Sequence, residues 1–221
     1  MPMDSANPSD VAESLQWPSP QPWPSHRARP RLGVMASGAG SNFEALVAAS
    51  RGGPLRASVE LLVVNNAACG ARDRAERLGI PCQWLDHRAF PSREELDGAL
   101  IQAFQAAAVD LVVMAGWMRI VTPRLIAAFP DRLLNIHPSL LPSFRGLDAV
   151  GQALAAGVRL TGCTVHLVRP EVDSGPILAQ AAVPVKPGDD GPTLAARIHR
   201  QEHRLLPLGV ALAAQRLEGD S

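Results

Sequence analysis

Short apolar runs alternate with longer amphipathic stretches from Arg31 almost to the C-terminus, and this alternation limits the folds open to the chain. Brief apolar runs separated by helical patterns are typical of parallel strands joined by crossover helices. The expected strands are Leu32–Ser37, Glu60–Asn65, Cys82–Leu85, Asp110–Ala115 and the segment that holds Asn135 and His137. The pattern predicts an α/β protein with a doubly wound, mostly parallel sheet and flanking helices.

The helices expected between these strands carry recognisable start signals. Ser92 and Glu95 form a capping box, and Thr122 followed by Pro123 is a favourable helix start. The expected helices cover about Asn42–Ser50, Ala71–Leu78, residues 92–107, Thr122–Phe129, Ala149–Ala156 and Pro192–Leu217. We expect a break or kink at Pro207, because proline cannot donate the helical hydrogen bond.

The C-terminal part follows a different pattern. Cys163–Val168 and Ile177–Val183 are expected strands joined by a loop through Asp173, and they form an antiparallel element. Residues 138–150 are rich in Pro, Gly, Phe and Arg and predict a mobile loop.

The first 30 residues differ from the rest in composition. They contain seven prolines with scattered Ser and Gln, which predicts a disordered Pro-rich extension over residues 1–30. Trp17 and Trp23 leave open a partner-binding peptide. A single domain is expected over residues 31–221.

Composition excludes several classes of function. Lys+Arg and Asp+Glu number 21 each, so nothing indicates an electrostatic hold on nucleic acid or an anionic membrane. No apolar run approaches the length of a membrane span. Cys69, Cys82 and Cys163 form no CxxC pair, so we expect reduced thiols in a cytoplasmic protein and no structural zinc. No sequence feature indicates an oligomeric state.

The turn Ser37-Gly38-Ala39-Gly40-Ser41-Asn42 lies between an expected strand and an expected helix. Its glycines allow close approach of the backbone, and free N–H groups at a helix start favour a phosphate. Phe43 replaces the third glycine of a dinucleotide fingerprint. A tight turn without a ligand is the alternative.

Asn135 and His137 alternate on one strand and therefore project together where Pro138 ends it. This end of a strand is where open α/β sheets bind ligands. An amide donor, an imidazole and the downstream carboxylate of Asp173 suit chemistry that develops an oxyanion. The alternatives are a core histidine bonded to a backbone carbonyl and a plain turn at Asp173, which sequence spacing alone cannot place beside His137.

Glu202 falls on the apolar stripe of the C-terminal helix, with Leu194, Ile198 and Leu205. A buried carboxylate requires a partner, which could be an internal arginine or an ammonium group of a substrate. His166, inside a strand, has no identifiable partner and is interpreted as a satisfied core histidine.

Five segments together resemble the folate-dependent phosphoribosylglycinamide formyltransferases, within the wider family of formyl-tetrahydrofolate enzymes. They are Ser37–Asn42, Ala115–Ile120, Asn135–Pro142, Val172–Pro176 and Gln201–His203. The resemblance covers about Arg31 to Leu217 and implies a Rossmann-like formyltransferase fold. It also implies a phosphate-binding half over residues 31–130 and a catalytic and folate-binding half over residues 131–221.

The resemblance implies transfer of the formyl group of 10-formyltetrahydrofolate, the co-substrate, to the amine of glycinamide ribonucleotide, without a metal. Asn135, His137 and Asp173 would be catalytic. The substrate-binding residues would be Gly40, Ser41, Asn42 and Glu202. The folate-binding residues would be Arg93, Met118, Arg119, Ile120, Val121 and Asn135.

The chain departs from the family in two places. Ala39 stands where relatives often have a polar residue, and the 143–151 loop lacks the family's usual proline and histidines. Formyltetrahydrofolate hydrolase and a non-catalytic folate- or nucleotide-binding module are the competing functions.

Overall fold

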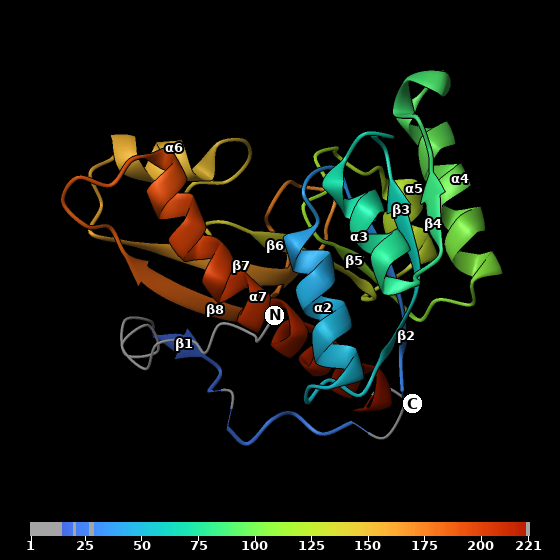
Figure 1. Ribbon diagram of the computed structural model, residues 1–221, viewed down its shortest axis with the longest axis horizontal. Coiled ribbons are helices and arrows are strands. Elements are labelled where there is room, and N and C mark those ends of the chain that lie inside the picture. The colour runs from blue at the N-terminus through green and yellow to red at the C-terminus, as the bar shows by residue number, and fades with distance from the viewer. Residues whose placement is uncertain (1–14, 20, 27–28, 220–221) are drawn as a thin grey trace.

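The computed structural model describes residues 15–19, 21–26 and 29–219. Within these residues one sheet of eight strands runs in the order β1-β8-β7-β6-β5-β2-β3-β4 (Figure 1). The strands are β1 (Gln16–Trp17), β2 (Arg31–Ala36), β3 (Ser58–Val64), β4 (Cys82–Trp84), β5 (Leu111–Met114), β6 (Leu133–His137), β7 (Leu160–Leu167) and β8 (Ile177–Pro184).

The sheet changes character at β6. Strands β4, β3, β2, β5 and β6 are parallel, whereas β7 pairs antiparallel with β6, and β8 antiparallel with β7. The prediction of a mostly parallel sheet with an antiparallel element in the C-terminal part is confirmed. β6 therefore has a parallel neighbour on one side and an antiparallel neighbour on the other.

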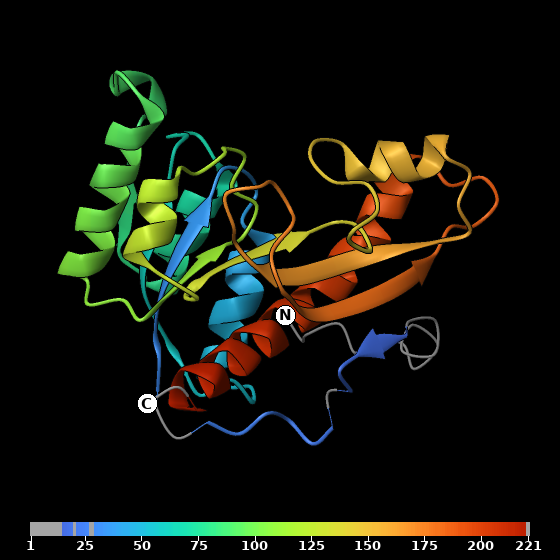
Figure 2. The same ribbon diagram turned by 180° about the vertical axis from the view of Figure 1, so that it is seen from behind.

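Helices cover both faces of this sheet. They are α2 (Ser41–Arg51), α3 (Gly70–Leu78), η1 (His87–Ala89), α4 (Arg93–Ala106), α5 (Pro123–Ala128), α6 (Ala149–Ala155) and α7 (Gly191–Gly219). Helices α2, α3 and α7 pack on one face and α4 and α5 on the other, as the front and back views show (Figures 1 and 2). Side chains alternate along β2 and so enter two hydrophobic cores, one on each face of the sheet. Val34 packs in the core on the face of α2, α3 and α7, and Met35 in the core on the face of α4 and α5.

Two boundaries differ from the prediction. β7 begins at Leu160, three residues before the expected Cys163, because Thr161 and Gly162 separate the single exposed Leu160 from the apolar run that follows. The predicted break at Pro207 is wrong, since α7 continues through it. Leu205, Leu206 and Leu208 are fully buried around the proline, so packing outweighs its low helix propensity.

The N-terminal segment lies along the antiparallel edge of the sheet. Gln16–Trp17 pairs with β8, and Ser25 accepts a hydrogen bond through its carbonyl from Gln215 Nε2 at 2.8 Å. For these residues the structure has an added strand and a contact with α7 rather than the expected disorder. Residues 1–14, 20, 27 and 28, on which the rest of that prediction falls, lie outside the described residues.

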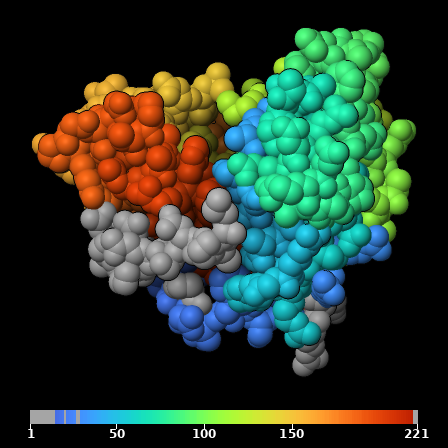
Figure 3. Space-filling model, viewed as in Figure 1, coloured from blue at the N-terminus to red at the C-terminus, as the bar shows by residue number. Residues whose placement is uncertain are grey.

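The space-filling view shows the α6–α7 part on one side of the molecule and the part built from α2, α3 and α4 on the other (Figure 3). Within the described residues, no helix combines the length and apolar character that crossing a membrane would require.

Gly162 in β7 offers a test of this packing. A Cβ at Gly162 would clash with the carbonyl oxygen of Ala181 on the neighbouring strand β8. Because backbone cannot move aside as a flexible side chain can, Gly162→Ala is expected to lower the free energy of unfolding by about 1–3 kcal/mol. Urea unfolding of both proteins measures this difference. Equal midpoints and slopes would contradict the tight β7–β8 approach.

Candidate active site

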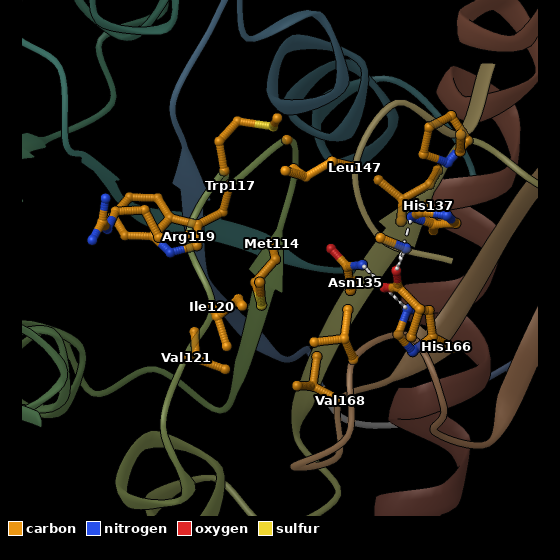
Figure 4. A pocket seen from close by; sticks show the side chains of 18 of the residues that line it. Met114, Trp117, Arg119, Ile120, Val121, Asn135, His137, Leu147, His166 and Val168 are labelled. Atoms are coloured by element: carbon orange, nitrogen blue, oxygen red, sulfur yellow. Dashed lines mark hydrogen bonds and ion pairs between the residues drawn. The ribbon is translucent and has the colours of Figure 1, made fainter. Parts of the chain in front are cut away.

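A cavity of about 620 Å³ opens where the parallel strands β5 and β6 end. Its lining combines apolar and polar side chains, and Figure 4 shows them on two sides. Asn135, His137 and His166 gather on one side, and Trp117, Arg119, Ile120 and Val121 lie on the other. A concave, mostly apolar cavity with a few convergent polar groups is typical of a small-molecule site.

Asn135 and His137 project from β6 into this cavity, as their alternation predicts. Asp173 arrives from the loop after β7 and reaches both of them. Its Oδ2 lies 3.3 Å from His137 Nδ1, and its Oδ1 accepts from Asn135 Nδ2 at 3.5 Å. Asp173 has a φ of 51°, a left-handed conformation that Asp tolerates better than most residues. The structure thus brings together three residues whose proximity spacing could not establish.

His137 is buried, with a carbonyl oxygen at hydrogen-bond distance from one ring nitrogen and a carboxylate at ion-pair distance from the other. Its Nε2 lies 2.8 Å from the carbonyl oxygen of Phe144, and its Nδ1 faces Asp173. A carbonyl and an ionised carboxylate can only accept, so a ring nitrogen that bonds to either of them must carry a proton. The alternative considered from the sequence, a histidine bonded to a backbone carbonyl, accounts only for the contact with Phe144. The contact with the Asp173 carboxylate comes in addition.

Asp173 is suited to remain ionised. Burial raises the pKa of Asp173, but hydrogen bonds from His166 and from the Gly146 N–H, with the positive charge of nearby histidines, outweigh it. The pKa of this carboxyl therefore lies below its ordinary value. An ionised carboxylate in this place can accept a hydrogen bond from an imidazole N–H.

His166 is a site residue that sequence reasoning missed. It is the direct cross-strand partner of Asn135, and its Nε2 lies 3.2 Å from Asn135 Nδ2 and 3.5 Å from Asp173 Oδ1. Its Nδ1 lies 2.9 Å from the Leu167 carbonyl oxygen and must donate there. In the neutral ring Nε2 then accepts from Asn135 and orients the amide, whereas in the charged ring Nε2 donates to Asp173 instead. Only the antiparallel register of β6 and β7 could have indicated this contact.

Glu202 and Asn42 form a buried pair at another part of the cavity. Asn42 Nδ2 donates to Glu202 Oε2 at 2.8 Å, and His199 Nε2 lies 4.0 Å from the same oxygen. Burial raises the pKa of Glu202, although the Asn42 hydrogen bond and nearby histidines oppose this. The partner that the structure gives Glu202 is therefore an amide with a histidine nearby, and not the arginine considered as the alternative. Asn42 Oδ1 is buried with no hydrogen-bond partner among the described residues.

The turn before α2 leaves the start of that helix open. Gly40 is the N-cap with a φ of 78°, and it makes no side-chain cap. A Cβ at Gly40 would lie 2.6 Å from Ala71 Cα, so the turn requires glycine for both its conformation and its packing. Asn42 lines the cavity, whereas Gly40 and Ser41 are not among its lining residues. The first amides of α2 remain suited to an anion.

The segment after β5 forms the wall opposite the histidines. Arg93 and the run Met118, Arg119, Ile120 and Val121 all line the cavity. Met118 N–H donates to Ser37 Oγ at 2.9 Å, which ties this wall to the turn before α2. Met118 and Ile120 are exposed and Val121 is buried, so the wall presents apolar surface at the mouth. Trp117, Leu147, Val168 and Arg169 also line the cavity and were not singled out from the sequence.

Comparison with known proteins agrees with this geometry. The model of the formyl transferase family matches residues 30–210. The human trifunctional purine biosynthetic protein adenosine-3 is 42% identical over 188 residues, which are 85% of this chain and 19% of that protein. The phosphoribosylglycinamide formyltransferase of Bacillus subtilis (strain 168) is 40% identical over 177 residues, 80% of this chain and 91% of that enzyme.

Solved structures give the same result. The glycinamide ribonucleotide transformylase 1 of Symbiobacterium toebii superposes with a TM-score of 0.83 at 45% identity, covering 85% of this chain and 88% of that one. The chain spans about a fifth of the trifunctional relatives but most of the single enzymes. The resemblance read from the sequence is confirmed, and the chain belongs to the formyl transferase family.

Proposed function

We propose that this protein transfers the formyl group of 10-formyltetrahydrofolate to the amine of glycinamide ribonucleotide, a step of purine synthesis. The observation that carries the proposal is the contact of Asn135, His137 and Asp173 at one wall of the 620 Å³ cavity. Binding alone requires no such trio, which supports an enzyme over a binding module. The single-enzyme relatives named for this activity support the choice of substrate.

The ribonucleotide occupies the end of the cavity near α2 in this proposal. Its phosphate binds the open amides around Gly40, Ser41 and Asn42, where the helix dipole favours an anion. Glu202 and the unpaired Asn42 Oδ1 accept hydrogen bonds from hydroxyl groups of the sugar. The amine then points toward His137.

The reduced folate occupies the other wall. Met118, Ile120 and Val121 pack against its ring, with Arg119 beside them, and Arg93 lies at the rim to meet a carboxylate of the folate. Asn135 contacts both the folate and the reacting carbonyl. Phosphate recognition thus falls to residues 31–130 and catalysis to residues 131–221, although folate binding draws on both halves.

The reaction is a direct transfer. The amine attacks the formyl carbon, and negative charge builds on the formyl oxygen. His137 and Asn135 donate hydrogen bonds to that oxygen, while Asp173 holds the imidazolium. The bond between the formyl carbon and N10 of the folate then breaks, and the bond between the formyl carbon and the ribonucleotide amine remains. The proton lost by the amine passes to N10. The chain's own groups suffice for these steps, without a covalent enzyme intermediate.

The experiment that tests the proposal follows the consumption of 10-formyltetrahydrofolate by the purified full chain, with and without glycinamide ribonucleotide. Consumption that requires the ribonucleotide and yields the formylated product is expected. Consumption without the ribonucleotide would instead show a hydrolase, and no consumption despite ligand binding would show a binding module.

Glu202→Gln tests the ribonucleotide end. Gln keeps the size of the side chain and an acceptor for Asn42 Nδ2, but it loses the charge. A hydrogen bond to a charged group contributes about 1.5–3 kcal/mol, so KM for the ribonucleotide is expected to rise roughly ten-fold or more. Steady-state kinetics with each substrate varied in turn measure this, and KM for the folate is the internal control. Equal effects on both KM values would contradict the assignment.

A further inference from the structure

The loop that follows the catalytic strand touches both His137 and Asp173 through its backbone. We call residues 143–148 the lid. The Phe144 carbonyl oxygen lies 2.8 Å from His137 Nε2, and the Gly146 N–H donates to Asp173 Oδ2 at 2.9 Å. The lid therefore contacts the imidazole on one side and its carboxylate partner on the other.

The lid backbone adopts an unusual conformation to make these contacts. Phe144, Gly146 and Asp148 have φ angles of 56°, 78° and 53°, all in the left-handed region. Such angles are unfavourable for Phe and persist only where surrounding contacts hold them. Gln152 Nε2 supplies such contacts, donating to the Leu147 carbonyl at 2.8 Å and to the Arg145 carbonyl at 3.1 Å.

We propose that the lid is a positioning element of the catalytic centre. Before substrate binds, the Phe144 carbonyl takes the place of the formyl oxygen as the hydrogen-bond partner of His137 Nε2. The Gly146 amide orients Asp173. The kinetic part of this inference rests on the proposed formyl transfer, whereas the contacts themselves exist without substrate.

The physical reason lies in the hydrogen bond that His137 Nε2 must make before and after the substrate binds. His137 is buried, and a ring N–H in a buried place is costly without an acceptor. The Phe144 carbonyl satisfies that N–H until a second carbonyl, the formyl group, takes its place. The exchange replaces one C=O acceptor with another, so the ring is already oriented when the substrate arrives.

The Gly146 contact acts on the carboxylate. Asp173 is faced by His137 and Asn135 from β6, by His166 from β7 and by the Gly146 amide from the lid. The Gly146 hydrogen bond is among the causes that hold the pKa of Asp173 below its ordinary value. Nearby, Arg145 and Glu171 pair with each other at 3.1 Å and link the lid to the Asp173 loop.

Gly146→Ala tests the lid without a clash. A Cβ at Gly146 meets nothing within 4 Å, so alanine changes only the energy of the left-handed conformation. Because that conformation costs an L residue enough to change an equilibrium by roughly 5- to 30-fold, we expect kcat to fall by about this factor. KM for the ribonucleotide should change little, because the hydrogen-bond and ion-pair partners of Asn42 and Glu202 among the described residues lie outside the lid.

Two further variants make the result specific. Gly146→Asn is expected to recover most of the loss, because Asn adopts left-handed angles more readily than Ala. Gly188→Ala imposes the same backbone cost in the loop before α7, where φ is 83° and a Cβ likewise meets nothing within 4 Å. It is expected to leave kcat unchanged and to affect stability alone.

A second measurement needs no turnover. In the full chain labelled with ¹⁵N-histidine, NMR should detect both ring N–H protons of His137 without substrate, assigned by their loss in His137→Gln. Gly146→Ala should weaken or broaden the Nε2 proton signal, and Gly188→Ala should not. Unchanged ring signals in Gly146→Ala would overturn the proposal even if the transferase assay succeeds. Altered signals would support it even if that assay fails.

Discussion

Replacing His137 with alanine is expected to lower kcat by about 10²–10³-fold, the loss typical of removing one oxyanion donor, or about 2.7–4 kcal/mol of barrier. In the structure His137 lies at the end of β6 with its Nε2 held by a carbonyl and its Nδ1 held by Asp173. The donor that stabilises charge on the formyl oxygen is then absent, whereas Asn42, Glu202 and the Met118–Val121 wall remain. Steady-state kinetics and binding titrations of both substrates measure the two effects.

The kinetics of His137→Ala distinguish a role in the transition state from no role in catalysis. Near-normal dissociation constants with a large loss of kcat support a role in the transition state. Intact turnover would show that another group supplies the charge. His87, outside the cavity lining, offers a control, since His87→Ala should leave both kcat and binding unchanged.

Asp173→Asn is expected to lower kcat by up to about 10⁴-fold, the loss seen when a carboxylate that orients a catalytic histidine is neutralised. The amide keeps the size of the side chain but loses the charge, and its N–H₂ group replaces one of two oxygens, of which one faces His137 and the Gly146 amide and the other faces His166. The histidine then loses both its counter-charge and its orientation. Measured kcat for Asp173→Asn and Asp173→Glu separates loss of charge from loss of geometry. A kcat near that of the wild type in Asp173→Asn would remove the carboxylate from the mechanism.

The same variant predicts a pH dependence of stability. The pKa of Asp173 is lowered in the folded protein from 3.8, so the unfolded state binds the proton more readily. The stabilisation from its charge is therefore complete above pH 3.8 and is lost as the pH falls through the lower, folded value. Urea unfolding of wild type and Asp173→Asn should differ most near neutral pH and converge in acid. A gap that widens in acid would contradict the lowered pKa.

The parallel part of the fold could be predicted because each of its elements is local. An apolar run, a capping box at Ser92 and the Thr122-Pro123 start each fix one element within a few residues. The face shared by Asn135 and His137 follows from strand alternation alone. Inward placement of Glu202 follows in the same way from helical spacing.

The rest depends on contacts between distant segments. Asp173 reaches His137 only through a left-handed backbone in a loop, and His166 meets Asn135 only through the β6–β7 register. The lid makes its contacts to His137 and Asp173 through its own backbone atoms, which carry no residue-type signal. The added strand Gln16–Trp17 was missed because its pairing is supplied by the edge of β8 and not by its own composition.

The catalytic centre depends on the antiparallel pairing of β6 with β7, and a single residue inserted into β7 would therefore disturb it. Side chains alternate along β7, so a one-residue slip against β6 would turn His166 to the opposite face of the sheet. The strands β2 to β5, which carry the turn before α2 and the Met118–Val121 wall, would keep their own pairing. An enzyme with such a slip would hold its ligands in place yet lack the histidine that orients Asn135. Length changes between Leu160 and His166 should therefore be far rarer in active relatives than changes in the identity of the residues there.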